Sequence, residues 1–232
     1  MNDKPSNMIN CRFEKKALLQ SFNFQELEFL VKSHPALFCE IHHGRFINNI
    51  YFDYPNLEQY YDNVAGISQR RKIRIRWYGD MVGHNERPIL EFKEKYGFYV
   101  KKQGYPLEDF IIDRQVSAGK LADIFRGSNL PGEILGTCLG MVPLFFNRYF
   151  RKYYISSCKR FRLTLDTNLE FFEFGNIGHN FSKKFSDLDT IILELKYDQE
   201  SIEEEETITS WFPFRITKHS KYVQGLESIF SW

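Results

Sequence analysis

Arg70-Arg71-Lys72-Ile73-Arg74-Ile75-Arg76-Trp77-Tyr78-Gly79 is the most informative stretch of this 232-residue chain. Successive side chains of a β-strand point to opposite faces, so one face of this stretch carries four cations and the other is mainly apolar. The cationic face holds Arg70, Lys72, Arg74 and Arg76. Like charges repel, and such a row persists only where water or a polyanion lies against it. The stretch predicts a strand with one cationic face, whose anion is a nucleic acid, a membrane or a phosphate compound.

Length and composition indicate one globular domain over residues 1–232. Hydrophobic residues make up 43% and aromatic residues 17%, which excludes a disordered chain. A chain of this length buries roughly 70% of its unfolded surface, enough for a core without disulfides or metals. The net charge is only +1, from 31 basic and 30 acidic residues, which argues against a polybasic protein. The positive charge of the cationic strand is therefore local.

The four cysteines, Cys11, Cys39, Cys138 and Cys158, form no CxxC pair and have no metal-ligand spacing. This favours structural thiols in a reducing compartment. The N-terminus has no apolar signal-peptide region, and no run of 18 apolar residues predicts a transmembrane segment. We therefore expect a cytoplasmic protein, for which any coupling to a membrane would need a partner protein.

Periodicity and turn residues predict two groups of strands separated by a helical insertion over residues 107–140. The helices outside the insertion are expected at 24–33, where Asn23 could cap the first turn, and at 56–64, 201–211 and 218–230. The strands are expected at 8–18, 45–53, 70–78, 88–96, 98–105, 142–156, 160–166, 169–174 and 190–197.

Five of these strands combine an apolar face with a face that mixes basic and acidic residues. Taken singly, each is typical of a half-buried strand with a solvated charged face. Taken together, they favour a closed antiparallel β-barrel with a charged interior and helices packed outside, an α+β fold. Unpaired charges in a confined space are costly, so the surplus of interior cations calls for a multivalent anion.

The charged strands resemble, in order, those of the catalytic domain of the vacuolar transporter chaperone (VTC) polyphosphate polymerases, within the CYTH-like triphosphate tunnel metalloenzymes. The resemblance covers about residues 10 to 230. Each motif is weak alone, but seven occur in sequence. The motifs are Arg12-Phe13-Glu14-Lys15-Lys16, Tyr51-Phe52-Asp53 with Arg74-Ile75-Arg76-Trp77-Tyr78-Gly79, Leu90-Glu91-Phe92-Lys93, Tyr149-Phe150-Arg151, Arg162-Leu163-Thr164-Leu165-Asp166-Thr167, Leu193-Glu194-Leu195-Lys196 and Lys218-His219-Ser220-Lys221-Tyr222.

This resemblance implies a tunnel of about eight strands in which the terminal phosphate of ATP is transferred to a phosphate or polyphosphate chain. It also implies a divalent metal, Mn²⁺ or Mg²⁺, held by Glu194, with Glu14 and Glu91 either assisting or orienting basic neighbours. The residues implied to act on the transferred phosphate are Arg74, Arg76, Arg151, Arg162 and Lys196. Those implied to bind the remaining phosphates are Arg12, Lys16, Lys93, Lys101, Lys218, Ser220 and Lys221.

These residue types suit phosphoryl transfer, which depends on positioning and on stabilising a highly charged transition state. Arginine offers two parallel donors to phosphate oxygens, lysine offers a point charge, and Mg²⁺ is typically held by one or two carboxylates plus phosphates and water. Lys101 and Lys102 are adjacent, so only one can face inward, and the sequence slightly favours Lys101.

Two other functions fit the same residues. The first is a triphosphatase that hydrolyses inorganic triphosphate or a nucleoside triphosphate on the same fold, since fold does not fix function. The second is a non-catalytic module that binds polyphosphate or RNA. Nucleic acid is the weaker candidate, because a nucleic-acid surface gains nothing from Glu14, Glu91 and Glu194 in phase with its cations.

Overall fold

The computed structural model describes residues 12–97, 99–113, 116–175 and 184–230, without the side chains of residues 12 and 99. One antiparallel sheet dominates this part of the chain, and its strands follow the order β1-β11-β9-β8-β2-β3-β5-β6, with β10 paired to β9. β4 (Gly83–Asn85) and β7 (Phe110–Ile112) form a separate two-stranded sheet. The strands of the large sheet are β1 (Arg12–Leu19), β2 (Cys39–Asp53), β3 (Gln69–Tyr78), β5 (Ile89–Tyr96), β6 (Tyr99–Pro106), β8 (Val142–Ile155), β9 (Arg162–Glu173), β10 (Lys184–Asp187) and β11 (Ile191–Asp198).

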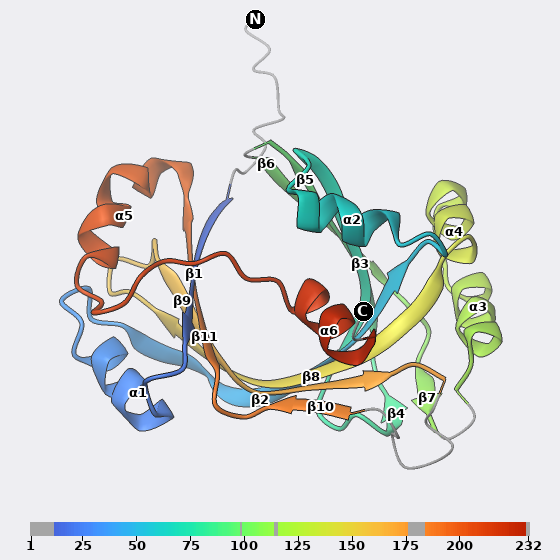
Figure 1. Cartoon of the computed structure of the whole chain (residues 1–232), viewed down its shortest axis with the longest axis horizontal. Coiled ribbons are helices and arrows are strands. Elements are labelled where there is room, and N and C mark those ends of the chain that lie inside the picture. Colours follow the sequence, from blue (N-terminus) through green and yellow to red (C-terminus); the bar gives the residue numbers. More distant parts are fainter. Residues whose placement is uncertain (1–11, 98, 114–115, 176–183, 231–232) are drawn as a thin grey trace, which may run out of the picture.

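The large sheet curls strongly, so that its two edge strands, β1 and β6, approach the same opening (Figure 1). Within the described residues no backbone ladder joins these two edges, and the pairing order ends at each of them. The prediction of a closed barrel is therefore not confirmed. A side-chain contact crosses the opening instead: Lys93 Nζ on β5 lies 2.9 Å from Glu14 Oε2 on β1.

The strand register explains why the charged residues converge. Directly opposite residues of an antiparallel pair share one face of the sheet. Arg74 lies opposite Glu91, Lys16 lies opposite Glu194, and Lys72 lies opposite Lys93. The period-two pattern of the sequence thus places these side chains on the concave face.

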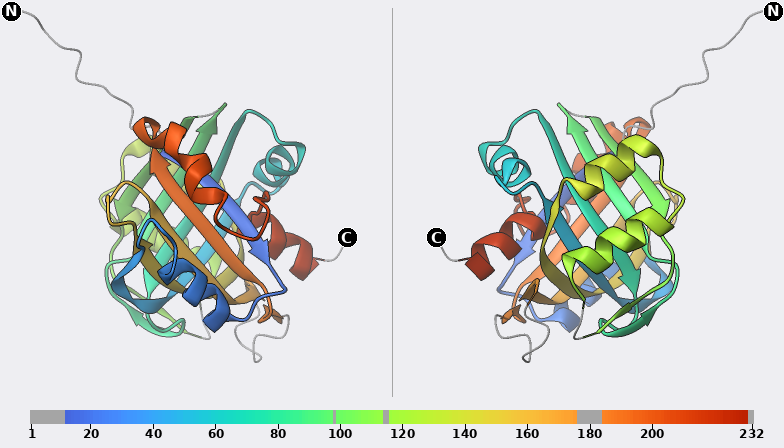
Figure 2. Two further views of the ribbon diagram at one scale, coloured as in Figure 1. Left: turned by 90° about the vertical axis from the view of Figure 1, so that its left-hand side faces the viewer. Right: turned by 90° about the vertical axis from the view of Figure 1, so that its right-hand side faces the viewer.

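The convex face of β3 and β5 packs against two helices, α3 (Ala118–Gly127) and α4 (Gly132–Leu139), which lie across the outside of the sheet (Figure 2, right). Leu121 and Phe125 of α3 join the same buried cluster as Ile73 and Trp77 of the cationic strand. The apolar face of that strand is therefore core, as its sequence predicts. The predicted helical insertion contains these two helices and also β7.

The remaining helices are α1 (Phe24–Lys32), α2 (Glu58–Ala65), α5 (Ile202–Thr209) and α6 (Lys221–Phe230). The predicted cap of α1 is confirmed, because Asn23 Oδ1 accepts from the Glu26 amide and Glu26 Oε2 accepts from the Asn23 amide. None of the described helices is long and apolar enough to cross a membrane.

Helix α6 lies on the concave side of the sheet (Figure 1), so the prediction that the helices pack outside is wrong for this one. Its Tyr222 ring packs on Tyr51 and Phe145, both on the concave face. The Tyr222 hydroxyl donates to Asp53, whose carboxylate also accepts from the Gln59 and Tyr60 amides of α2. Part of the concave face is therefore apolar, and α6 covers it.

Two smaller differences from the sequence expectations concern strands. Residues 160–166 and 169–174, expected as two strands, form the single strand β9, which accommodates an extra residue where Asn168 adopts a φ of 53°. The sequence does not predict strand β10, because its four residues, Lys-Phe-Ser-Asp, show no apolar alternation.

Gly225 in the middle of α6 allows the helix to approach the sheet. A Cβ there would lie 2.6 Å from Phe145 Cζ and 2.8 Å from Phe171 Cδ1. We expect Gly225→Ala to lower the free energy of unfolding, because an overpacked core costs about 1–3 kcal/mol and this exceeds the gain of about 1 kcal/mol in helix propensity. Urea denaturation measures the change.

The matched control is Gly136→Ala in α4, where an added Cβ meets nothing within 4 Å. Its helix propensity should make that variant as stable as the wild type or more so. If Gly225→Ala proved equally harmless, α6 would not be packed as closely as described.

Candidate functional site

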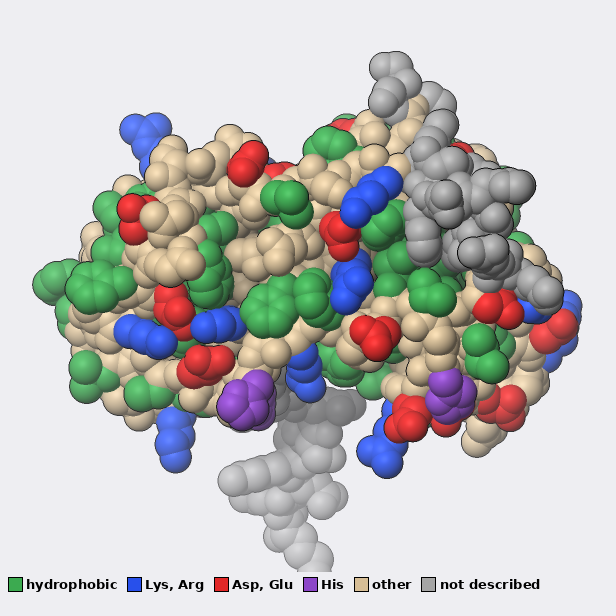
Figure 3. All heavy atoms as spheres, turned by 90° about the horizontal axis from the view of Figure 1, so that it is seen from below, with side chains coloured by type: hydrophobic (Ala, Val, Ile, Leu, Met, Phe, Trp, Pro, Cys, Tyr) green, Lys and Arg blue, Asp and Glu red, His purple; other side chains and the backbone are tan. Residues whose placement is uncertain are grey.

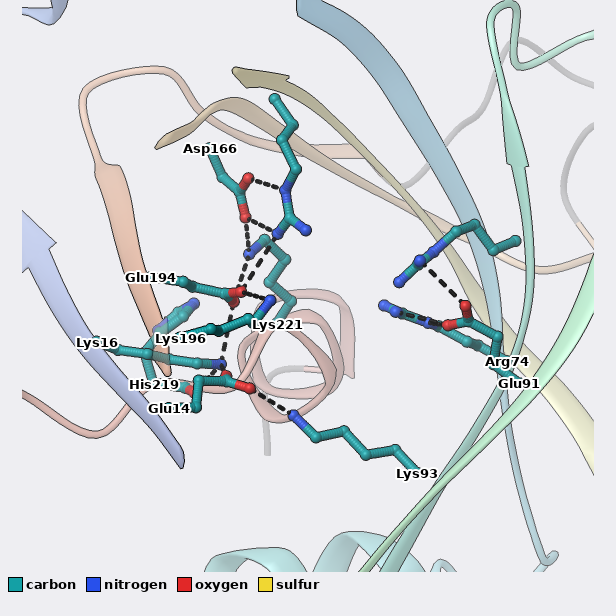
Figure 4. Close-up of polar contacts among 12 residues, drawn as sticks. Glu14, Lys16, Arg74, Glu91, Lys93, Asp166, Glu194, Lys196, His219 and Lys221 are labelled. Carbon is teal, nitrogen blue, oxygen red and sulfur yellow. Dashed lines mark hydrogen bonds and ion pairs between the residues drawn. The ribbon is translucent and has the colours of Figure 1, made fainter. Parts of the chain in front are cut away.

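A cavity of about 420 Å³ opens on the concave side of the sheet, and we call it the central cavity. Its charged lining comes from β1, β3, β5, β6, β8, β11 and the start of α6, so it combines residues distant in the sequence (Figure 4). The nine cations of the lining outnumber its three glutamates, Glu14, Glu91 and Glu194. The cations are Lys16, Lys72, Arg74, Arg76, Lys93, Lys102, Arg151, Lys196 and Lys221.

One wall of the central cavity is organised around Glu14 and Glu194. Lys16 Nζ lies 2.8 Å from Glu14 Oε1 and 3.2 Å from Glu194 Oε1, and Lys196 Nζ lies 2.9 Å from Glu194 Oε2. Burial alone would raise the pKa of Glu194, but Lys16, Lys196 and Arg151 outweigh it and hold that pKa well below its ordinary value. Burial alone would lower the pKa of Lys16, but Glu194 and Glu14 raise it. The wall is ionised at neutral pH.

Asp166 anchors the base of this wall. It is fully buried, and its carboxylate accepts from Arg151 Nε at 2.5 Å, Arg151 Nη2 at 2.6 Å and Lys221 Nζ at 2.5 Å. Burial would raise the pKa of Asp166, but Arg151 and Lys221 lower it below the ordinary value. Because Arg151 comes from β8 and Lys221 from α6, Asp166 fixes the helix against the cationic wall.

The opposite wall is organised around Glu91 (Figure 4). Glu91 Oε2 lies 2.8 Å from Arg74 Nη2, and Glu91 Oε1 lies 3.0 Å from Arg76 Nη1 and 2.7 Å from Lys102 Nζ. Arg74 also donates to the Tyr51 hydroxyl at 3.1 Å. Both oxygens of Glu91 contact cations, which fits the orienting role expected of Glu91.

Lys102 lines the central cavity and Lys101 does not, so the expectation that Lys101 faces inward is wrong. The reason is the register of the β5–β6 hairpin, in which Lys102 lies opposite Lys93 and Lys101 lies opposite Glu94. The sequence could not fix this register, because the turn between the two strands sets it.

The remaining expected residues divide into two groups. Eleven of them line the central cavity together: Arg74, Arg76, Arg151, Lys196, Lys16, Lys93, Ser220, Lys221, Glu14, Glu91 and Glu194. Arg162 and Lys218 are exposed and outside that lining, although Arg162 lies opposite Lys196 on the same face of the sheet. The side chain of Arg12 lies outside the described part of the chain.

Three charged residues of the site are absent from the expected site residues: Asp166, Lys72 and Lys102, of which Lys102 is the alternative to Lys101. The first two had a detectable signal, because Asp166 is in phase with Arg162, and Lys72 is in phase with Arg74. Tyr51 and Tyr149, which also line the central cavity, had none beyond their place in the motifs.

The carboxylates of the central cavity partly suit a divalent metal. Among the described residues, no cluster of three or more His, Cys, Asp or Glu side chains could hold an ion by itself. Glu14 and Glu194 nevertheless share Lys16 as a partner, so both carboxylates point to one place. Two carboxylates completed by phosphates and water are a typical Mg²⁺ environment. Glu14 and Glu194 therefore fit a metal that arrives with phosphate.

Solved structures share this fold. A protein from Pyrococcus horikoshii OT3 is 16% identical with a TM-score of 0.50, over 93% of this chain and 98% of that one. A putative adenylate cyclase from Bacillus halodurans is 14% identical with a TM-score of 0.50, over 93% and 96%. A putative adenylate cyclase from Vibrio parahaemolyticus is 10% identical with a TM-score of 0.50, over 92% and 96%. At these identities the likeness shows the fold alone.

A strongly curled antiparallel sheet is thus the class of fold that this chain shares with the two putative adenylate cyclases. The VTC domain family model matches residues 11–230, so the chain belongs to the VTC domain family, as its motifs indicated. No curated protein matches the chain.

Asp166→Asn tests the anchor of the cationic wall. Breaking a buried ion pair leaves uncompensated charge, so we expect a loss of about 3–5 kcal/mol in the free energy of unfolding at pH 7. The native pKa of Asp166 lies below its unfolded value of about 3.9, so its contribution is present above that pH and is lost as the pH falls further. Urea denaturation across this range should therefore show that the free energy of unfolding falls less steeply with decreasing pH in the variant than in the wild type.

Asp123→Asn is the control, because Asp123 forms an exposed i,i+3 pair with Arg126 on α3. An exposed pair of this kind contributes little to stability. Equal losses of unfolding free energy in the two variants would mean that Asp166 contributes no more to stability than an exposed carboxylate does.

Proposed function

We propose that this chain transfers the terminal phosphate of ATP onto a phosphate or polyphosphate chain inside the central cavity, with Mn²⁺ or Mg²⁺. The observation that carries the proposal is the surplus of cations in the lining, nine lysines and arginines against three glutamates. A linear chain of phosphates is a multivalent anion of matching charge. Membership of the VTC domain family supports the same reaction class.

The arrangement of the cations suits the chemistry. Phosphoryl transfer passes through a loose transition state with charge spread over the phosphate oxygens, so fixed donors accelerate it. Glu91 and Asp166 hold Arg74, Arg76 and Arg151 in place through short contacts before any substrate arrives. This preorganisation favours Arg74, Arg76, Arg151 and Lys196 as the residues that act on the transferred phosphate.

The other lining residues suit binding of the rest of the chain. Lys16, Lys93, Lys102, Ser220 and Lys221 surround the same cavity. Lys218 and Arg162 are exposed, which suits contact with phosphates beyond the cavity, and the same role is proposed for Arg12. Glu14 and Glu194 would hold the metal, which when bound neutralises phosphate charge.

Pairing of the carboxylates with cations favours phosphate transfer over hydrolysis. Each described acidic residue of the cavity and its base (Glu14, Glu91, Asp166 and Glu194) is paired with a cation. A triphosphatase needs a group to activate water, whereas an anionic phosphate acceptor is already a nucleophile. A nucleic-acid partner has less support, because on the described part of the face drawn in Figure 3 basic side chains are scattered among acidic and apolar ones.

The product of the reaction separates these functions. The protein incubated with ATP and Mn²⁺, with and without a short polyphosphate primer, should yield chain products on a gel. Phosphate release without chains would indicate a triphosphatase instead. Glu194→Gln should abolish turnover while most ATP binding remains, since arginines and lysines supply the binding. Glu204→Gln, in an exposed pair with Arg160 outside the cavity, is the control and should leave turnover unchanged.

ATP affinity tests the position of the arginines. Arg74→Ala should weaken ATP binding by about 1.5–3 kcal/mol, the scale of a hydrogen bond to a charged group. Arg162→Ala should weaken it less, because Arg162 is exposed outside the cavity lining. Calorimetric titration compares the two. A larger loss for Arg162 than for Arg74 would place the nucleotide at the exposed end of the sheet.

A further inference from the structure

Lys72 differs from the other cations of the central cavity. Each of the other eight has a carboxylate oxygen within 4.0 Å in the described structure. Lys72 has none among the described ion pairs, and its Nζ donates to the Ser220 hydroxyl at 2.8 Å. Lys72 is therefore a buried amine of the central cavity whose described partner is a neutral oxygen.

The groups that face Lys72 are mostly cationic. Arg70 and Arg74 flank it on β3, and Lys93 lies opposite it on β5. From β1 it is influenced by Lys16 and, less strongly, by Glu14, and Lys72 itself helps to lower the pKa of His219 in the segment before α6. Burial is the largest influence and the three cations Lys16, Lys93 and Arg70 follow, so the pKa of Lys72 lies well below its ordinary value.

A phosphate group that binds at Lys72 competes with fewer negatively charged partners than one that binds at the other cations of the central cavity. An anion that binds Arg74, Arg151 or Lys196 shares that cation with a carboxylate that already contacts it. An anion that binds Lys72 meets only a hydroxyl contact, and it supplies the negative charge that the described ion pairs do not give this amine. Buried charges are stabilised when they gain a partner of opposite sign.

We propose that Lys72 is a further phosphate-binding residue of the central cavity and that it takes up a proton when a phosphate chain binds. The inference rests on the proposed function, because it assumes that the central cavity binds linear phosphates. It adds a specific residue and a coupling between binding and pH. One phosphate of a bound chain would lie between Lys72, Ser220 and Lys93.

Calorimetric titration with inorganic tripolyphosphate tests this inference without nucleotide, metal or turnover. Titrations at pH 7.5 in buffers of different ionisation enthalpy give the protons exchanged per ligand bound. The variants are Lys72→Met, which removes the charge, and Lys72→Arg, which keeps the charge but stays protonated at every working pH. Lys101→Met is the control, since Lys101 is exposed on the hairpin outside the cavity.

We expect Lys72→Met to bind tripolyphosphate about 10- to 100-fold more weakly, the effect of one charge-assisted contact. It should also lose proton uptake relative to the wild type, and its thermal stability should not fall, because Lys72 has no described ion pair to lose. Lys72→Arg should bind nearly as tightly as the wild type but without that uptake. Lys101→Met should match the wild type in affinity for tripolyphosphate and in the number of protons exchanged per ligand bound.

Two results would overturn the inference. One is unchanged affinity and proton exchange in Lys72→Met. The other is proton uptake that persists in Lys72→Arg, which would assign the proton to Lys93 or His219; this arm stands even if Lys72→Met fails to fold. A wild-type protein that does not bind tripolyphosphate at all would instead contradict the proposed function.

Discussion

Pairing between carboxylates and cations on the concave face is the constraint on which this structure depends. A sheet that curls onto itself brings many like charges together, and repulsion alone would open it. Glu14, Glu91, Asp166 and Glu194 prevent this by standing between the cations at contact distance. The carboxylates are too few to neutralise the lining, so the pairing holds the walls in place and still leaves the cavity strongly positive.

The same pairs connect parts of the chain that are distant in sequence. Asp166 joins β9 to β8 through Arg151 and to α6 through Lys221, and Asp53 joins β2 to α2 and to Tyr222. The C-terminal helix is thereby fixed on the concave side by buried polar contacts as well as by aromatic packing. Its first turn supplies Lys221 to the cavity, so the position of the helix and the composition of the site are determined together.

The faces of the strands could be predicted from the sequence, because a period of two assigns each side chain of β3, β5 and β11 to one side without further information. Eleven of the expected site residues, including Arg74, Arg151 and Glu194, do line one cavity. The choice between Lys101 and Lys102 could not be predicted, since it depends on hairpin register. The location of α6 could not be predicted either, because the sequence pattern indicated a charged concave face and did not reveal the apolar part formed by Tyr51 and Phe145, on which Tyr222 packs. Sheet closure is a property of edge pairing, and side-chain alternation carries no information about it.

The ion pair between Glu14 and Lys93 spans the opening between the sheet edges, where no described backbone ladder does. The Lys93 side chain is 42% exposed, so mobile ions reach this contact. A partly exposed ion pair weakens as salt is added, and the screening length falls to about 3 Å at 1 M. We therefore expect electrolyte concentration to act on this protein twice, once through competition with anionic ligands and once through the contact that joins the two rims of the sheet.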